Sequence, residues 1–432
     1  MPSPPTLIHR VLTRIVTVDP AEIRALLLSF AYFFTLLASY YVLRPVRDEM
    51  GVQAGTQKLP WLFSAVFVTM LLLVPLFGWL AGRLPVRKLI PTVYGFFASH
   101  LLCFFAALSM GVPHAAVAPI FFVWVSVFNL FVVSVFWSVM ADLYSTESAR
   151  RLFGFIAAGG SLGAVAGPLF TALMVPVLGV APLLLVSIAL LFTALACFYA
   201  LLREAPQSPA TAASTTHAPK EQEAPPSLLI GLVKILQSRY LLAICLYLGC
   251  YSVLSTMLYS QQMRIVPEVV GSPEARTQLF AWVDFAVNAV TVLTQLLLTG
   301  RLLSGLGVTT MLAAVPAFNV FGFTVFGFAP VLAVLVAFGV LRRAGEFAIA
   351  KPTRETLFTV VTKEEKYQAK NAIDTVVHRG GDMASSWISS ALQSAGLSVG
   401  HMAFAALPIA AFWLATGLYL GRRHEALRRQ PE

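Results

Sequence analysis

Long apolar runs alternate with short polar segments along almost the whole chain. Each run holds about 20 residues or more, the length at which an α-helix crosses the hydrocarbon core of a bilayer. The pattern predicts an all-α membrane protein with twelve spans, near residues 23–44, 60–82, 89–110, 115–141, 154–176, 181–202, 240–263, 278–299, 308–328, 330–350, 370–395 and 399–420.

One segment interrupts this pattern in the middle of the chain. Residues 203–227 are rich in Pro, Ala and Thr and have no apolar period, so we expect a disordered cytoplasmic linker. The linker separates two six-helix halves. The predicted organisation is a segment 1–22, a half 23–202, the linker 203–227, a half 228–421 and a tail 422–432.

The composition agrees with a protein dissolved in lipid. Hydrophobic residues make up 58% of the chain and charged residues 12%, against about 45–50% and about 25% in soluble domains. The net charge of +10 could suggest a nucleic-acid partner, but the charges cluster between the apolar runs, as topology signals do. We therefore expect the lipid bilayer and a small-molecule substrate as partners, and no nucleic acid.

The distribution of positive charge predicts the orientation of the spans. With a cytoplasmic N-terminus, the inner segments and tails carry 22 of the 30 Lys and Arg residues, and the outer loops carry five. Cytoplasmic loops carry such an excess. Both termini are therefore expected in the cytoplasm.

An internal repeat supports two halves with the same orientation. Short matches recur after about 220 residues: Arg44 with Arg264, residues 82–84 with 300–302, and Gly159-Gly160 with Gly380-Gly381. An even number of spans in each half gives both halves the same orientation in the membrane.

Two segments resemble the major facilitator family. Residues 78–88 look like the family's loop between spans two and three, and Gly154, Gly163 and Gly167-Pro168 look like the glycine–proline pattern of its antiporters. The resemblance implies the major facilitator fold, transport by alternating access and possible antiport. Close helix packing without a substrate role remains an alternative reading of these glycines.

A narrower resemblance links the chain to the ATP/ADP translocase, or nucleotide transporter, family and its bacterial relatives. It rests on Leu43-Arg44-Pro-Val-Arg47-Asp48, on Glu147-Ser-Ala-Arg150-Arg151-Leu-Phe-Gly154, and on Lys351-Pro-Thr-Arg354-Glu355 followed by Lys370-Asn-Ala-Ile-Asp374. The resemblance implies an anionic, nucleotide-like or phosphorylated cargo and a monomer in a bacterial inner membrane.

Charges inside the predicted spans point to a polar path. Arg342, Arg343 and Arg379 lie deep in spans ten and eleven, where each would cost about 2.5–3.5 kcal/mol if it faced lipid. Glu346 and Asp382 lie one turn from these arginines and can offset two of them. The third arginine needs another partner, either Asp284 or an anionic substrate. Structural ion pairs inside the bundle remain the alternative.

The candidate site residues follow from these charges and resemblances. The expected substrate-binding residues are Arg44, Arg47, Arg342, Arg343, Arg379 and Asn288. The expected coupling or gating residues are Asp284, Glu346, Asp382, Asp142, Lys351, Lys370 and Asp374. His378 is the candidate imidazole for a coupling proton.

No catalytic motif accompanies these residues. The sequence has no His-Glu-x-x-His, no phosphate-binding loop and no nucleophile elbow, so we expect no enzyme, no metal and no cofactor. The favoured function is transport of a small anionic solute. The alternatives are a proton-coupled facilitator or exporter of another organic solute, and a receptor or scaffold that transports nothing.

The predicted topology can be tested by labelling from outside intact cells. A cysteine at position 214 (Ser214→Cys) should stay unlabelled by an impermeant maleimide, because the linker is expected in the cytoplasm. Ser272→Cys, in a predicted outer loop, is the positive control. Strong labelling at position 214 would contradict the topology.

Overall fold

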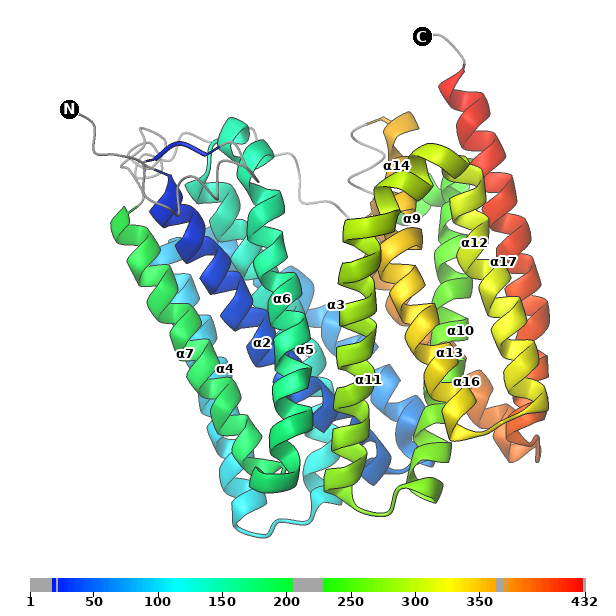
Figure 1. Cartoon of the computed structure of the whole chain (residues 1–432), viewed down its shortest axis with the longest axis horizontal. Helices are drawn as coiled ribbons and strands as arrows, with labels where there is room; N and C mark the ends of the chain where they lie inside the picture. The colour runs from blue at the N-terminus through cyan, green and yellow to red at the C-terminus, as the bar shows by residue number, and fades with distance from the viewer. Residues whose placement is uncertain (1–17, 21, 205–227, 363–368, 371, 430–432) are drawn as a thin grey trace. The chain divides into compact units, whose positions relative to one another are not determined.

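Every element that the structure describes is helical. The computed structural model describes residues 18–20, 22–204, 228–362, 369, 370 and 372–429 (Figure 1). Outside these ranges lie the first 17 residues, the last three, and the predicted linker except for its first two positions, 203 and 204. The described helices fall into two compact units.

The first unit contains residues 1–50, 74–220 and 277–285. Its helices are α2 (Ile23–Ala54), α4 (Val86–Ser109), α5 (His114–Leu143), α6 (Thr146–Leu178) and α7 (Ala181–Glu204). Helix α4 packs against α5 and α7, and α6 also packs against α7. Part of α11 (Pro273–Thr294) belongs to this unit, because the boundary after residue 285 falls inside that helix.

The second unit contains residues 51–73, 221–276 and 286–432. It begins with η1 (Thr56–Lys58) and most of α3 (Leu59–Arg83). Its other elements are α9 (Leu228–Gln237), α10 (Arg239–Val269), both ends of α11, η2 (Gln295–Thr299), α12 (Gly300–Phe328), α13 (Leu332–Gly345), η3 (Glu346–Ala350), α14 (Lys351–Thr356), η4 (Leu357–Val360), η5 (Ile373–Val377), α16 (His378–Ser394) and α17 (Val399–Arg428).

Over the described ranges, nine helical stretches are long and apolar enough to cross a membrane. One of them, Pro273–Phe328, covers two predicted spans and contains a break at Gly307, whose φ is 76°. Predicted spans ten and eleven correspond to α13–η3 and η5–α16, which carry charged residues in their interiors. The all-α membrane fold is confirmed, and the count of twelve spans stays a prediction.

Close packing between helices accounts for several of the glycines singled out in the sequence. In the first unit, Gly159 and Gly163 of α6 lie against the backbone of α2 at Phe30 and Phe34. In the second unit, Gly381 of α16 lies against Ser252 of α10. The matching glycines of the repeat, Gly160 and Gly381, therefore each lie against the first long helix of their own half.

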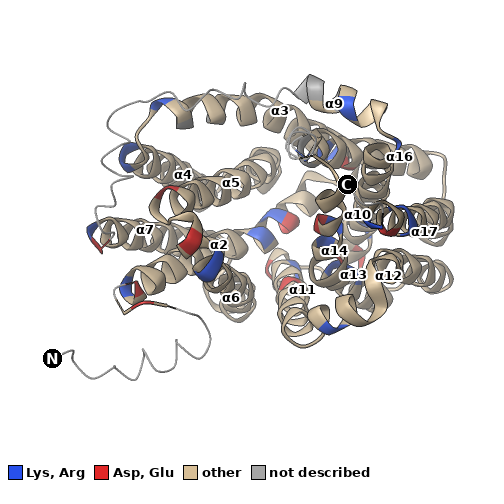
Figure 2. Ribbon diagram, turned by 90° about the horizontal axis from the view of Figure 1, so that it is seen from above, with Lys and Arg blue, Asp and Glu red and all other residues tan. Residues whose placement is uncertain are grey.

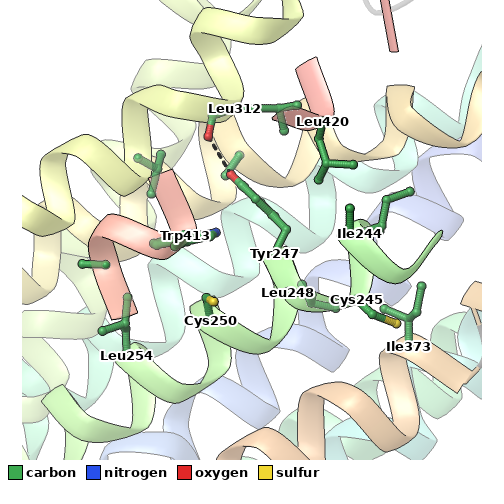
Figure 3. Packing of buried hydrophobic residues seen from close by; sticks show 14 of the residues in the cluster. Ile244, Cys245, Tyr247, Leu248, Cys250, Leu254, Leu312, Ile373, Trp413 and Leu420 are labelled. Carbon is green, nitrogen blue, oxygen red and sulfur yellow. Dashed lines mark hydrogen bonds between the residues drawn. The ribbon is translucent and has the colours of Figure 1, made fainter. Parts of the chain in front are cut away.

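The apolar core of the second unit is centred on α10, α12 and α17. Figure 3 shows Tyr247 of α10 beside Trp413 of α17, with Cys250 and Leu254 further along α10. The Tyr247 hydroxyl donates a hydrogen bond of 2.9 Å to the Leu312 carbonyl, so its polar end is satisfied inside the core. Helix α10 is held on this side by apolar packing, which leaves its other faces for polar contacts.

The glycine contacts generate a prediction about stability. In Gly163→Ala, the new methyl group would clash with the Phe34 carbonyl oxygen and approach the Ala38 amide nitrogen to 3.0 Å. We expect a loss of about 1–3 kcal/mol of stability, seen as a lower melting temperature in detergent. Gly154→Ala is the matched control, because nothing lies within 4 Å of its added methyl group. Equal melting temperatures for the two variants would contradict the packing account.

Candidate functional site

A polar face on α10 forms the centre of the candidate site in the second unit. Tyr251 and Ser255 are one helical turn apart, and so are Ser252 and Thr256. The four residues make two adjacent polar stripes within an otherwise mostly apolar stretch of this helix. The stripe of Tyr251 and Ser255 contacts α13. The stripe of Ser252 and Thr256 contacts α16.

Arg342 of α13 reaches the first stripe. Its Nη2 donates a hydrogen bond of 3.1 Å to the Ser255 hydroxyl, and its guanidinium carbon lies 5.8 Å from the centre of the Tyr251 ring. The side chain is buried, with 3% exposed. Its Nε and Nη1 atoms have no hydrogen-bond partner among the described residues. Arg342 is therefore a buried cation whose donors are only partly satisfied.

Glu346 lies one turn from Arg342 but pairs with a different arginine. Its Oε1 atom lies 3.5 Å from Nη1 of Arg354 in α14, and both side chains are largely buried. The sequence spacing predicted pairing with Arg342 or Arg343. The five-residue π-turn η3 begins at Glu346, and its wider turn rotates the following residues, which helps bring Arg354 onto the side of Glu346.

Asp382 of α16 contacts the second stripe. It accepts hydrogen bonds from Ser252, at 2.6 Å, and from Thr256, at 3.0 Å. His378 lies 3.5 Å from the same carboxylate, and Arg379 lies 3.7 Å from it. The expected contact between Arg379 and Asp382 is present. The carboxylate also contacts Ser252, Thr256 and His378. Sequence spacing alone does not predict that these three residues gather around it.

In the first unit, the predicted residues of α2 make their own ion pairs. Arg44 lies 3.1 Å from Asp284, whose side chain is 1% exposed. Arg47 pairs with its neighbour Asp48 at 2.6 Å and lies over the Phe122 ring at 5.1 Å. Asp284 is thus a partner of Arg44.

The translocase-like segments form two further contacts. Lys370 Nζ lies 2.7 Å from the carboxylate of Glu355, which joins the two segments of the 351–374 block. At the start of α6, Ser148 donates to Glu22 at 2.9 Å and Arg151 pairs with it at 3.2 Å. Burial alone would raise the pKa of Glu22, but these partners hold that pKa below its usual range.

The remaining predicted residues are less tightly grouped. Asn288 of α11 is buried, Arg343 is half-buried, and Asp142 and Lys351 are exposed. Asp374 lies in η5, and its side chain lies outside the described part of the chain. The roles assigned to these residues stay predictions.

Sequence reasoning missed the uncharged part of the site. The predicted site residues did not include Tyr251, Ser252, Ser255 or Thr256. Arg354 was noted only as part of the translocase-like segment at residues 351–355. The available signal was the pair of polar residues repeated at a spacing of four within an apolar span. Within the described residues, no three His, Cys, Asp or Glu side chains gather as a metal site requires.

The arrangement suits recognition of a charged solute. Figure 2 shows charged positions on and around α13 and α14 against mostly uncharged helices. Arginine donors, hydroxyl groups and an aromatic ring together can bind an anion and a flat organic group.

The comparisons with known proteins agree with this architecture. The chain matches the model of the Major Facilitator Superfamily over residues 25–273, more than half of its length. It is 26% identical over 232 residues to ADP,ATP carrier protein 2 of Chlamydia pneumoniae, a match covering 48% of this chain and 43% of the carrier. The matched region is thus less than half of that carrier's length.

Solved structures show the same fold at low sequence identity. A bacterial homologue of the iron transporter ferroportin has a TM-score of 0.66 at 12% identity, covering 94% of this chain and all of that one. An auto-inhibited peptide transporter of the POT family has a TM-score of 0.63 at 14% identity, covering 95% and 98%. The nucleoside transporter NupG has a TM-score of 0.52 at 14% identity, covering 96% and 100%.

The helical fold, the apolar spans and the match over more than half of the sequence lead to one conclusion: the chain belongs to the Major Facilitator Superfamily and is a multi-pass membrane transporter of that type.

Proposed function

We propose that this transporter carries a small anionic solute, phosphorylated or nucleotide-like, by alternating access and in exchange for a second solute. The observation that carries the proposal is the state of Arg342. Its side chain is 3% exposed, and two of its three nitrogen atoms have no partner among the described residues. A phosphate or carboxylate would supply the missing acceptors.

The energetics favour a ligand over a purely structural role. Nε carries one N–H group and Nη1 carries two, so three donors of a buried cation lack acceptors. Each unsatisfied group costs about 1–3 kcal/mol, and more when it is charged. A structural ion pair would remove this cost with a carboxylate, but the nearby Glu346 is paired with Arg354. The site retains unsatisfied donors that an anion can use.

Two further observations support a nucleotide-like anion. The curated relative is an ADP,ATP carrier, and the segments at residues 351–355 and 370–374 resemble that family. The Tyr251 ring beside Arg342 offers an aromatic surface on which a base could stack. A nucleotide would use both the cation and the ring.

Replacing Arg342 separates ligand binding from stability. Arg342→Gln should reduce exchange of labelled ADP for internal ATP in liposomes about tenfold or more, because a charged hydrogen bond contributes about 1.5–3 kcal/mol. The ligand-free variant should melt no lower than the wild type, since the substitution removes a buried, poorly satisfied cation.

Arg354→Gln is the matched control within the same site. It breaks the buried pair with Glu346, so it should destabilise the protein by about 3–5 kcal/mol. If Arg342→Gln exchanges nucleotides normally, the proposed role of Arg342 is wrong. If it destabilises the protein as much as Arg354→Gln does, Arg342 has a structural role.

A second candidate function is transport coupled to a proton. It is favoured by the contact between His378 and Asp382, in which the carboxylate also accepts bonds from Ser252 and Thr256. A histidine beside a buried carboxylate can gain and lose a proton as the site opens to either side. His378 and Asp382 are on the same helix as Arg379. The charge of the His378–Asp382 pair can therefore influence a bound anion.

Proton coupling predicts a specific effect of His378→Gln. An inward proton gradient should accelerate uptake by the wild type but not by the variant, while exchange at equal pH on both sides continues. The measurement is initial uptake of the same labelled ADP with and without the gradient. If the wild-type uptake rate is the same with and without the gradient, proton coupling through His378 and Asp382 is excluded.

A further inference from the structure

A second polar cluster lies between the ends of α10 and α16, separate from the Arg342 site. Gln261 and Arg264 are three residues apart on α10, and Ser386 and Ser389 are three residues apart on α16. Residues with this spacing share a helix face, and the two helices pack against each other. All four side chains line one small pocket, which η1 and the start of α3 also border.

Each of these four side chains presents a polar atom with no partner among the described residues. The atoms are Gln261 Oε1, Arg264 Nη1, Ser386 Oγ and Ser389 Oγ. Gln261, Ser386 and Ser389 are 4%, 2% and 3% exposed. Buried polar groups in proteins almost always have partners, so four unpartnered atoms around one space indicate a site for a small polar guest.

The dimensions of the pocket limit the size of this guest. Between its lining side chains the pocket has room for about one water-sized particle. A phosphate, a sulfate or an organic carboxylate is larger than the space, whereas a water molecule or a single-atom ion is comparable to it.

The charge of the pocket favours an anion over water. Arg264 contributes a positive charge, and none of the lining residues that the structure describes is acidic. The sequence repeat places Arg264 at the position of Arg44, which pairs with Asp284 in the first unit. When the offset of about 220 residues is subtracted from position 284, the residue that matches Asp284 is Ser64, which carries no charge. Arg264 thus lacks the carboxylate that neutralises its counterpart.

The serine hydroxyls and the glutamine amide can adapt to an anion. Both hydroxyls can rotate and donate a proton into the pocket. The Gln261 amide nitrogen contacts only the Met402 sulfur, at 3.2 Å, which is a weak acceptor. Rotating the amide by half a turn directs its N–H groups into the pocket, so the four side chains can all act as donors.

We propose that this pocket is a halide site, occupied by chloride, which neutralises Arg264 and joins α10, α16 and the start of α3. The site differs in place and size from the Arg342 site. It selects a single-atom anion, whereas the transported solute is a larger organic anion. The consequence is that the folded transporter is stabilised by chloride whether or not its substrate is present.

The test uses the purified full-length protein and compares chloride with gluconate and sulfate at constant ionic strength. Chloride should raise the melting temperature by a few degrees and saturate, because it binds the folded state. Bromide should act in the same way, and sulfate should have no such effect. Radioactive chloride should be retained by the wild type in equilibrium dialysis.

Arg264→Gln and the double variant Ser386→Ala with Ser389→Ala should each lose the chloride-dependent shift. Arg276→Gln is the matched control, since this arginine hydrogen-bonds the carbonyls of Val270 and Gly271 outside the pocket, and it should keep the shift. Equal melting of the wild type in chloride and gluconate would overturn the proposal and identify a water site. A full shift in both pocket variants, or an equal effect of sulfate, would also overturn it.

Discussion

The positive charge of Arg342 is the constraint that shapes the polar site of the second unit. A guanidinium group left in the membrane interior is costly, so its neighbours must replace the water that it loses. Ser255 and the Tyr251 ring do so in part, from one face of α10. Glu346, one turn further along the chain, forms an ion pair with Arg354. The protein therefore buries Arg342 without fully satisfying it, and an anionic solute can complete its coordination.

The π-turns place the charged groups around this arginine. Element η3 starts at Glu346, and η5 ends directly before His378. In η3 the carbonyl groups of Phe347 and Ala348 accept hydrogen bonds from Gln295, at 3.1 Å, and Thr299, at 2.8 Å, both in η2. Side chains of one π-turn thus satisfy the backbone of another. Such turns are frequent at functional sites, and they give a helix a position where its register can change.

The sequence predicted the features that depend on local pattern. The long apolar runs predicted the helices. The buried arginines were identified because a charged side chain within an apolar span has a high free-energy cost. The spacing of Arg379 and Asp382 correctly predicted their contact. The ion pair between Glu346 and Arg354 was not predicted, because a π-turn changes the rotation of the residues after it and no residue pattern marks that turn. The predicted offset of Arg342 or Arg343 by Glu346 stays a prediction. The serines and threonine of α10 were missed because uncharged polar residues cost little in a span and give a weak signal.

The repeat shows how one helical framework carries different chemistry in its two halves. Arg44 has a carboxylate partner in Asp284, and Arg264, at the matching position of the repeat, lies in a pocket without an acid. The framework itself includes close glycine contacts that recur in both halves, at Gly160 and Gly381. Matching positions of the repeated scaffold therefore have different electrostatic surroundings in the two halves.

The central claim is that the site recognises negative charge through Arg342. Its most direct test is a melting-temperature comparison of matched solutes that differ only by phosphate groups: adenosine with AMP, ADP and ATP, and glycerol with glycerol 3-phosphate. The account predicts that at least one phosphorylated member stabilises the purified protein and that its neutral partner does not, because only the former supplies acceptors for the buried guanidinium. Equal stabilisation by the neutral and phosphorylated members of a pair would contradict it.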